Sequence, residues 1–150
     1  MIRVLFVCHG NICRSPMAEY VMKDLVKKTG VSDRFLIDSA ATSREEIGNP
    51  VHPGTRQKLR QEGIPCGDHR ARRMEKADYD KYDYLIGMET WNIKNMLRIT
   101  GGDPDKKISR LLDFSQHPRD IADPWYTGNF DETFEDVMEG CRALLAYCIQ

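Results

Sequence analysis

The 150-residue chain lacks the features that direct a protein to a membrane, to nucleic acid or to secretion. No apolar run is long enough to span a bilayer, and no small-residue cleavage site follows the apolar N-terminal residues. With 22 basic and 23 acidic residues, the net charge of −1 predicts no general attraction to nucleic acid or to a membrane surface. Internal repeats, low-complexity segments and linkers are also absent. We therefore expect one domain over residues 1–150, located in the cytoplasm.

The cysteines of the chain also lack the even number and regular spacing of a disulfide framework. The five are Cys8, Cys13, Cys66, Cys141 and Cys148. An odd number without a repeat indicates reduced thiols. Cys8 and Cys13 would supply only half of a zinc site, because no second close pair completes four ligands. Cys141 and Cys148 fall on the apolar stripe of the last predicted helix, which favours packing in the core.

The N-terminal residues predict a strand, a tight loop and a helix in succession. Residues 2–7 form an apolar run of strand-forming residues, as in a strand that is covered on both faces. Pro16 is a favoured first helical residue behind a possible Ser15 cap, and Gly30 fits the end of this helix. This arrangement directs backbone N–H groups and the positive end of the helix dipole toward the loop.

The loop carries residues suited to binding phosphate beside a nucleophile. Its sequence is Cys8-His9-Gly10-Asn11-Ile12-Cys13-Arg14-Ser15. Gly10 permits a positive φ and Asn11 tolerates one, which allows the chain to wrap around an oxyanion. Arg14 offers a planar fork for two phosphate oxygens, and the same field favours a Cys8 thiolate aimed at phosphorus. The alternative is a buried strand-end cysteine beside a surface arginine.

The remainder of the chain alternates between strand-like and helix-like segments. Strands are predicted at residues 35–40, 84–88 and 108–114, and helices at residues 52–62, 90–99 and 130–148. This alternation indicates an α/β fold with one doubly wound domain, in which a four-stranded parallel sheet has helices on both faces. Ligands bind such sheets beyond the carboxyl ends of the strands, where Cys8 is placed.

A candidate acid precedes the last predicted helix, in the segment Asp123-Pro124-Trp125-Tyr126. Pro124 restricts Asp123 to extended conformations, and the two aromatic residues are suited to shield it from water. Spacing alone equally fits an Asp-Pro turn with two surface aromatic residues. The residues by themselves therefore leave the role of Asp123 open.

The loop resembles the signature of the low-molecular-weight protein-tyrosine phosphatases, in which Cys, five residues, Arg and then Ser or Thr lie near the N-terminus. The resemblance also covers residues 38–41, 48–53, 83–92 and 123–126. It implies that Cys8 is the nucleophile, that Arg14 binds phosphate, and that Asp123 acts first as acid and then as base. It further implies a monomeric hydrolase of phosphotyrosine in proteins, with a phosphocysteine intermediate and neither metal nor cofactor.

The resemblance assigns four residues to a network that supports the loop: Asn11, Ser15, Ser39 and His69. Each also has a simpler interpretation. Ser15 can cap a helix, Ser39 can end a strand, and His69 lies in a basic stretch that is typical of a solvated surface.

The chain departs from the family pattern at the rim of the predicted site. His9 stands where an apolar or small residue is usual, and Arg44-Glu45-Glu46 replaces a wall aromatic. The predicted substrate walls are therefore Ile12, Glu45, Trp125 and Tyr126. Cys13, five residues after Cys8, is either a small apolar filler or a redox partner that captures an oxidised Cys8.

Three alternatives to a phosphotyrosine phosphatase remain at this point. Thiol-coupled arsenate reductases of this fold use a later pair of close cysteines, whereas only Cys66 lies mid-chain here. Phosphoarginine phosphatases of this fold carry threonine at the position of Ile12. A phosphocysteine carrier domain would have no use for Arg14 and Asp123 in hydrolysis.

Overall fold

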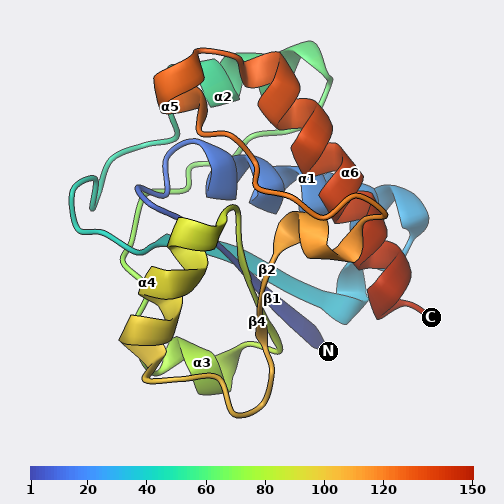
Figure 1. Cartoon of the computed structure of the whole chain (residues 1–150). Coiled ribbons are helices and arrows are strands. Elements are labelled where there is room, and N and C mark those ends of the chain that lie inside the picture. The colour runs from blue at the N-terminus through green and yellow to red at the C-terminus, as the bar shows by residue number, and fades with distance from the viewer.

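A four-stranded, all-parallel sheet forms the centre of the computed structural model, which describes residues 1–150 (Figure 1). The strand order is β2-β1-β3-β4. The bounds are Ile2–Cys8 for β1, Phe35–Ala41 for β2, Tyr84–Gly87 for β3 and Ile108–Arg110 for β4. β1 lies between β2 and β3, with Val4 paired to Ile37 on one side and to Tyr84 on the other. The predicted parallel sheet is confirmed.

Helices cover both faces of this sheet. On one face α1 (Arg14–Thr29) and α6 (Phe130–Cys148) pack over Val4 and Phe6. On the other face α3 (Asp78–Lys81) and α4 (Thr90–Thr100) pack over Leu5 and Val7. Alternate side chains of β1 thus enter two separate cores, and for this reason its sequence is apolar at successive positions.

The connections place the end of β1 at a switch in strand order. From β1 the chain passes through α1 to β2, and from β2 it returns past β1 to β3 by way of α2 (Pro53–Gln61) and α3. The loops that leave β1 and β3 therefore diverge, and a crevice is expected between them. Cys8 is the last residue of β1 and borders this crevice.

The fourth strand is shorter than predicted. Only residues 108–110 pair with β3, and residues 111–114 form a 3₁₀ turn, η2 (Leu111–Phe114). Asp113 causes this change, because one of its carboxylate oxygens accepts the Arg110 N–H at 2.9 Å and so starts the turn. Leu111 and Leu112 remain fully buried, which explains why their segment has the composition of a strand.

Three short elements were not predicted: η1 (Ser32–Arg34), α3 and α5 (Pro124–Thr127). The remaining helices closely match the predicted segments, and α6 has the predicted bounds. Cys141 is fully buried in the core, and the partly buried Cys148 packs against this core, as expected. None of the helices is long and apolar enough to cross a bilayer.

Candidate active site

The residues between β1 and α1 form a loop around the Cys8 sulfur. Cys8 as a whole is only 3% exposed. The Asn11 N–H donates to Cys8 Sγ at 3.3 Å, and Ser15 Oγ lies 3.0 Å from the same sulfur. The predicted capping role of Ser15 is wrong. α1 begins at Arg14 after Cys13, so Ser15 lies inside its first turn and its hydroxyl faces the sulfur instead.

The curvature of the loop depends on Asn11 rather than on Gly10. Asn11 has a φ of 59°, in the left-handed region that asparagine tolerates better than most residues. Gly10 does not have a positive φ. Its missing side chain serves a different purpose, because a Cβ at this position would lie 3.3 Å from Cγ of Glu46. Glycine therefore allows the Glu46 side chain to lie close to the loop.

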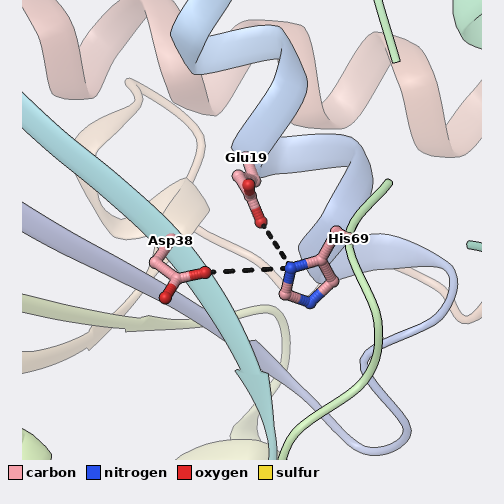
Figure 2. Close-up of side chains that lie close together, drawn as sticks. All are labelled: Glu19, Asp38 and His69. Atoms are coloured by element: carbon pink, nitrogen blue, oxygen red, sulfur yellow. Dashed lines mark ion pairs between the residues drawn. The ribbon is translucent and has the colours of Figure 1, made fainter. Parts of the chain in front are cut away.

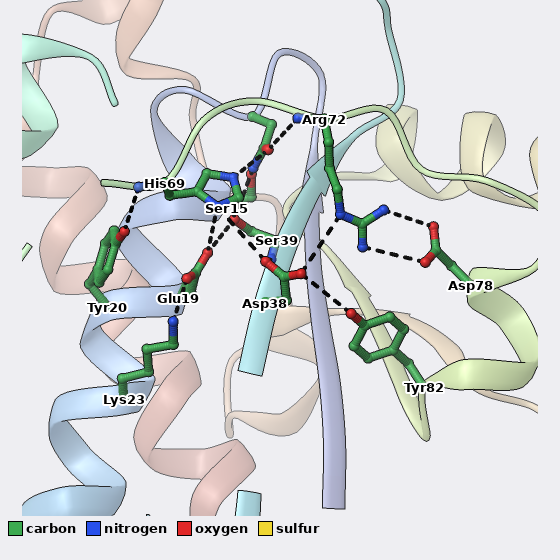
Figure 3. Close-up of polar contacts among 11 residues, drawn as sticks. Ser15, Glu19, Tyr20, Lys23, Asp38, Ser39, His69, Arg72, Asp78 and Tyr82 are labelled. Carbon is green, nitrogen blue, oxygen red and sulfur yellow. Dashed lines mark hydrogen bonds and ion pairs between the residues drawn. The ribbon is translucent and has the colours of Figure 1, made fainter. Parts of the chain in front are cut away.

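A network of hydrogen bonds holds Asn11 in this conformation, and Figure 3 labels its partners Ser15, Ser39, His69 and Arg72. Its amide Nδ2 donates to Ser15 Oγ at 2.8 Å and to Ser39 Oγ at 3.0 Å. Its Oδ1 accepts the backbone N–H of Arg72 at 3.2 Å and lies 2.7 Å from His69 Nε2. The structure thus brings together Asn11, Ser15, Ser39 and His69 behind the loop.

Two carboxylates that sequence reasoning missed hold His69 in place. His69 Nδ1 lies 3.5 Å from Glu19 Oε1 and 3.8 Å from Asp38 Oδ1. Figure 2 shows both carboxylates directed at this nitrogen. Glu19 is 3% exposed, although it follows the loop in sequence on a helix with a solvated face. A buried glutamate requires a polar or charged partner. The partners of Glu19 can be predicted only once the fold is known.

Glu19, Asp38 and His69 also have the spacing of a metal site, since one ligand-type atom of each lies within 4.8 Å of the others. The Glu19 oxygens already have partners, because Lys23 Nζ contacts Oε2 at 2.6 Å and the Ser39 hydroxyl donates to Oε1 at 2.6 Å. We therefore interpret this cluster as an ion-pair network that positions His69.

Arg14 is nearly inaccessible, with 2% of its side chain exposed. It donates to Glu89, to the carbonyl of Ile121 at 2.8 Å, and to Asp123 Oδ2 at 3.4 Å. Burial opposes its charge, but the negative charges of Cys8, Asp123 and Glu89 outweigh burial and raise the pKa of Arg14. Sequence reasoning missed Glu89, whose position just before α4 is typical of a helix cap.

Asp123 faces Arg14 from the loop that leads into α5. As predicted from Pro124, its backbone is extended, with φ −80° and ψ 115°. Its Oδ1 accepts the Trp125 N–H at 3.0 Å, and its Oδ2 points to Arg14. Trp125 and Tyr126 are 58% and 83% exposed, so they stand beside the pocket and do not seal Asp123 from water.

Trp125 is linked to α2 and α6 through aromatic contacts. The ring of His52, which caps α2, meets Trp125 edge-on at 5.8 Å and stacks on Phe130 at 5.4 Å. The His52 N–H donates to the carbonyl of Ile12 at 2.8 Å. Phe130 covers Gly54 so closely that a Cβ there would lie 2.3 Å from its Cζ. His52 therefore connects the sulfur-bearing loop to the loop that carries Asp123.

These groups enclose one pocket of about 140 Å³. Ten of its eleven lining residues were predicted as site residues: Cys8, His9, Gly10, Ile12, Cys13, Arg14, Glu45, Asp123, Trp125 and Tyr126. The eleventh, Glu46, was noted in the sequence but not predicted to line the site. Within this pocket, burial and the negative charges of Cys8 and Asp123 raise the pKa of the Cys13 thiol to about 12. Cys13 is therefore protonated at neutral pH.

The family model described as low molecular weight phosphotyrosine protein phosphatase matches residues 3–149. The chain belongs to this family. The low molecular weight protein-tyrosine-phosphatase YfkJ of Bacillus subtilis is 45% identical over 148 residues, which cover 97% of this chain and 95% of the relative. Membership confirms the resemblance and the expectation that the protein is an enzyme of the low-molecular-weight protein-tyrosine-phosphatase family.

Solved structures agree with the fold of the phosphatase. The crystal structure of YfkJ has a TM-score of 0.96 at 44% identity, covering 99% of this chain and 95% of that chain. SP-PTP from Streptococcus pyogenes has a TM-score of 0.90 at 39% identity, covering 100% and 95%. DARP, described as a drosophila arginine phosphatase, has a TM-score of 0.88 at 27% identity, covering 98% of each chain.

Proposed function

We propose that the phosphatase hydrolyses phosphotyrosine through a covalent phosphocysteine on Cys8, without a metal ion or a cofactor. The observation that carries this proposal is the placement of Cys8 Sγ. It lies within hydrogen-bonding distance of the Asn11 N–H and Ser15 Oγ, in a pocket that also contains Arg14 and Asp123. A sulfur held among donors at a helix N-terminus is stabilised as the thiolate, which is the reactive form.

In the first step, the phosphoryl group binds between the loop amides and the Arg14 fork. Arg14 reaches it by turning the N–H that now faces Asp123 at 3.4 Å toward a phosphate oxygen. Cys8 Sγ attacks phosphorus, the bond from phosphorus to the tyrosyl oxygen breaks, and Asp123 gives that oxygen its proton. Glu89 and the Ile121 carbonyl keep the guanidinium in place throughout.

In the second step, water replaces the thiolate on phosphorus. Asp123, now ionised, takes a proton from the water as it attacks, and the bond from phosphorus to sulfur breaks. The Ser15 hydroxyl, 3.0 Å from Cys8 Sγ, donates to the sulfur as negative charge returns to it. Phosphate leaves and the thiolate is restored.

The walls of the pocket support an aryl substrate. Ile12 contributes an apolar branched side chain to the lining, and Trp125 and Tyr126 contribute aromatic rings. All five cysteines are free thiols, and we place the activity in the cytoplasm, where thiols stay reduced. We also propose that residues 1–150 act as one monomeric phosphatase domain.

A direct test combines turnover with trapping of the intermediate. The protein should release phosphate from p-nitrophenyl phosphate and from a phosphotyrosyl peptide in the presence of EDTA. Rapid acid quenching should leave a phosphoryl group on the peptide that contains Cys8, detected by mass spectrometry. Cys8→Ser should lose nearly all turnover yet still bind vanadate, because a serine hydroxyl stays protonated at pH 7. Cys148→Ser, outside the pocket, is the matched control. Substantial turnover by a folded Cys8→Ser protein would disprove the mechanism.

The alternatives receive less support from the site. Cys66, the one mid-chain cysteine, does not line the pocket and has no close cysteine partner, as an arsenate-reductase relay would require. Asp123 beside Arg14 provides the acid that a phosphocysteine carrier does not need. A phosphoarginine substrate is disfavoured by the apolar side chain of Ile12 in the wall.

A further inference from the structure

The two departures from the family pattern, which lie far apart in sequence, meet at the mouth of the pocket. His9 Nε2 contacts Glu45 Oε2 across 36 positions of sequence. Both side chains are accessible, with 45% of His9 and 68% of Glu45 exposed. An apolar wall is therefore replaced by a polar rim, composed of His9, Glu45 and Glu46.

Most carboxylates around the mouth have a cationic partner. Arg14 pairs with Glu89 and Asp123, and His9 pairs with Glu45 when the imidazole is protonated. A second groove shares His9, Arg14 and Asp123 with the pocket. It also contains Asp120, whose Oδ1 accepts from Arg110 at 3.0 Å. Glu89, Asp123 and Asp120 thus each contact an arginine.

Glu46 is the exception. The partner of its carboxylate is the neutral side-chain amide of Asn49. Its stem lies over Gly10, at the edge of the loop that surrounds Cys8. The nearest cation in sequence, Arg44, lines a separate groove together with Arg72 and Arg73 and is absent from the active-site lining. Glu46 therefore leaves an uncompensated negative charge at the entrance.

We propose that Glu46 and Glu45 form a cation-binding subsite that selects phosphotyrosine flanked by lysine or arginine, and that His9 moderates this selection by pairing with Glu45. The inference rests on the proposed function, because it names the class of phosphoprotein that this site takes.

The expected preference follows from where the charges of the substrate and of the rim lie when phosphotyrosine is bound. The phosphoryl group enters the pocket toward Arg14, so the residues next to the phosphotyrosine remain at the rim. A flanking lysine or arginine is long enough to reach Glu46 with its charge while its stem stays outside, whereas a flanking glutamate meets like charge. Exposed pairs of this kind change a rate about two- to fivefold per charge, and salt weakens them.

The test compares three peptides of one sequence whose phosphotyrosine is flanked on both sides by lysine, by alanine or by glutamate. The wild type should show the highest kcat/KM for the lysine peptide and the lowest for the glutamate peptide. In about 0.5 M NaCl the lysine-to-glutamate ratio of kcat/KM should fall toward one, because salt screens exposed charge pairs. The decrease should be about as large as the combined effect of two such pairs. This measurement needs no variant and so does not depend on how a variant folds.

Three charge-removing variants test the assignment to residues. Glu46→Gln keeps the stem over Gly10 and should lower the lysine-to-glutamate ratio about two- to fivefold, and Glu45→Gln should lower it as well. His9→Gln removes the imidazole that contacts Glu45, and with it the positive charge that the protonated ring supplies, and should raise the ratio. Glu135→Gln, on the exposed face of α6, is the matched control and should leave the ratio unchanged.

Equal kcat/KM for the lysine and glutamate peptides in the wild type would overturn the inference, as would an unaltered ratio in Glu46→Gln. These outcomes are distinct from a failure of the proposed function, in which none of the three peptides would be hydrolysed and the inference would fall with it.

Discussion

Asn11 and His69 are joined across 58 positions of sequence, with Asn11 Oδ1 2.7 Å from His69 Nε2. Asn11 is the left-handed residue of the cysteine loop, and its amide nitrogen reaches Ser15 and Ser39 on the other side. One side chain thus connects the loop after β1 to α1, β2 and the segment before α3. The shape of the loop depends on residues from four parts of the chain.

Two substitutions at Asn11 separate backbone shape from hydrogen bonding. Asn11→Gly keeps easy access to a φ of 59° but removes the side-chain bonds, whereas Asn11→Ala removes the same bonds and also disfavours this φ. We expect both variants to lose kcat/KM, because Ser15 and Ser39 lose their common donor. Asn11→Ala should also have a free energy of unfolding about 1 kcal/mol lower than Asn11→Gly in urea titrations. Equal stability of the two variants would show that the left-handed conformation costs nothing here.

Asp123→Ala should lower kcat about 10²–10⁴-fold for phenyl phosphates whose phenols have a high pKa, because no group then protonates the leaving oxygen. The loss should shrink as the pKa of the phenol falls. The measurement is kcat/KM across a series of aryl phosphates. Asp131→Ala, an exposed carboxylate outside the pocket, serves as the control. A uniform loss across the series would assign Asp123 a structural role.

Cys13 should protect Cys8 from irreversible oxidation. Peroxide converts the Cys8 thiolate to a sulfenic acid, and the Cys13 thiol then forms a disulfide with it and releases water. Because the raised pKa of Cys13 keeps it protonated, peroxide should attack Cys8 first. Activity after peroxide should return on adding dithiothreitol in the wild type but less completely in Cys13→Ser. Recovery should be normal in Cys66→Ser, and equal recovery in the Cys13 variant would exclude the protective role.

Ile12 should favour an aryl leaving group over a guanidinium. Its branched apolar side chain lines the pocket with Trp125, and apolar contacts of this kind discriminate by about 1–3 kcal/mol. The wild type should therefore have the higher kcat/KM for phosphotyrosine, and Ile12→Thr should shift the ratio toward phosphoarginine by about tenfold. A conservative Ile12→Val control should keep the original preference. Faster hydrolysis of phosphoarginine by the wild type would reverse the substrate assignment without affecting Cys8.

The sequence was sufficient to predict the sheet and the loop because both depend on local signals. The apolar run of β1, the glycine after α1 and the heptad-like stripe of α6 each report their own structure. The strand predicted at 108–114 was partly wrong because the same apolar residues can be buried by a tight turn as well as by a strand. In that segment Asp113 decides, through a single hydrogen bond to the backbone.

The partners of the site were harder to predict because they act across the fold. No sequence motif identifies the three carboxylates Glu19, Asp38 and Glu89. Each acquires its role from a residue on another element. Gly10 was assigned the wrong reason for being glycine, since its need for space becomes evident only when Glu46 is placed over it. The contact between His9 and Glu45 likewise follows from the path of two loops and not from either segment alone.

The packing of Phe130 on Gly54 has a consequence for how this protein can vary over evolutionary time. Any side chain at position 54 would overlap the phenyl ring, because its Cβ would fall 2.3 Å from Cζ of Phe130. The ring also stacks on His52, which contacts Trp125 beside the proposed acid. Substitutions at positions 54 and 130 should therefore be coupled. A larger residue at one position is accepted only when the other position carries a smaller one. Each such exchange would shift the support beneath Trp125, so lineages that make it should also differ in how they hold the tyrosine ring.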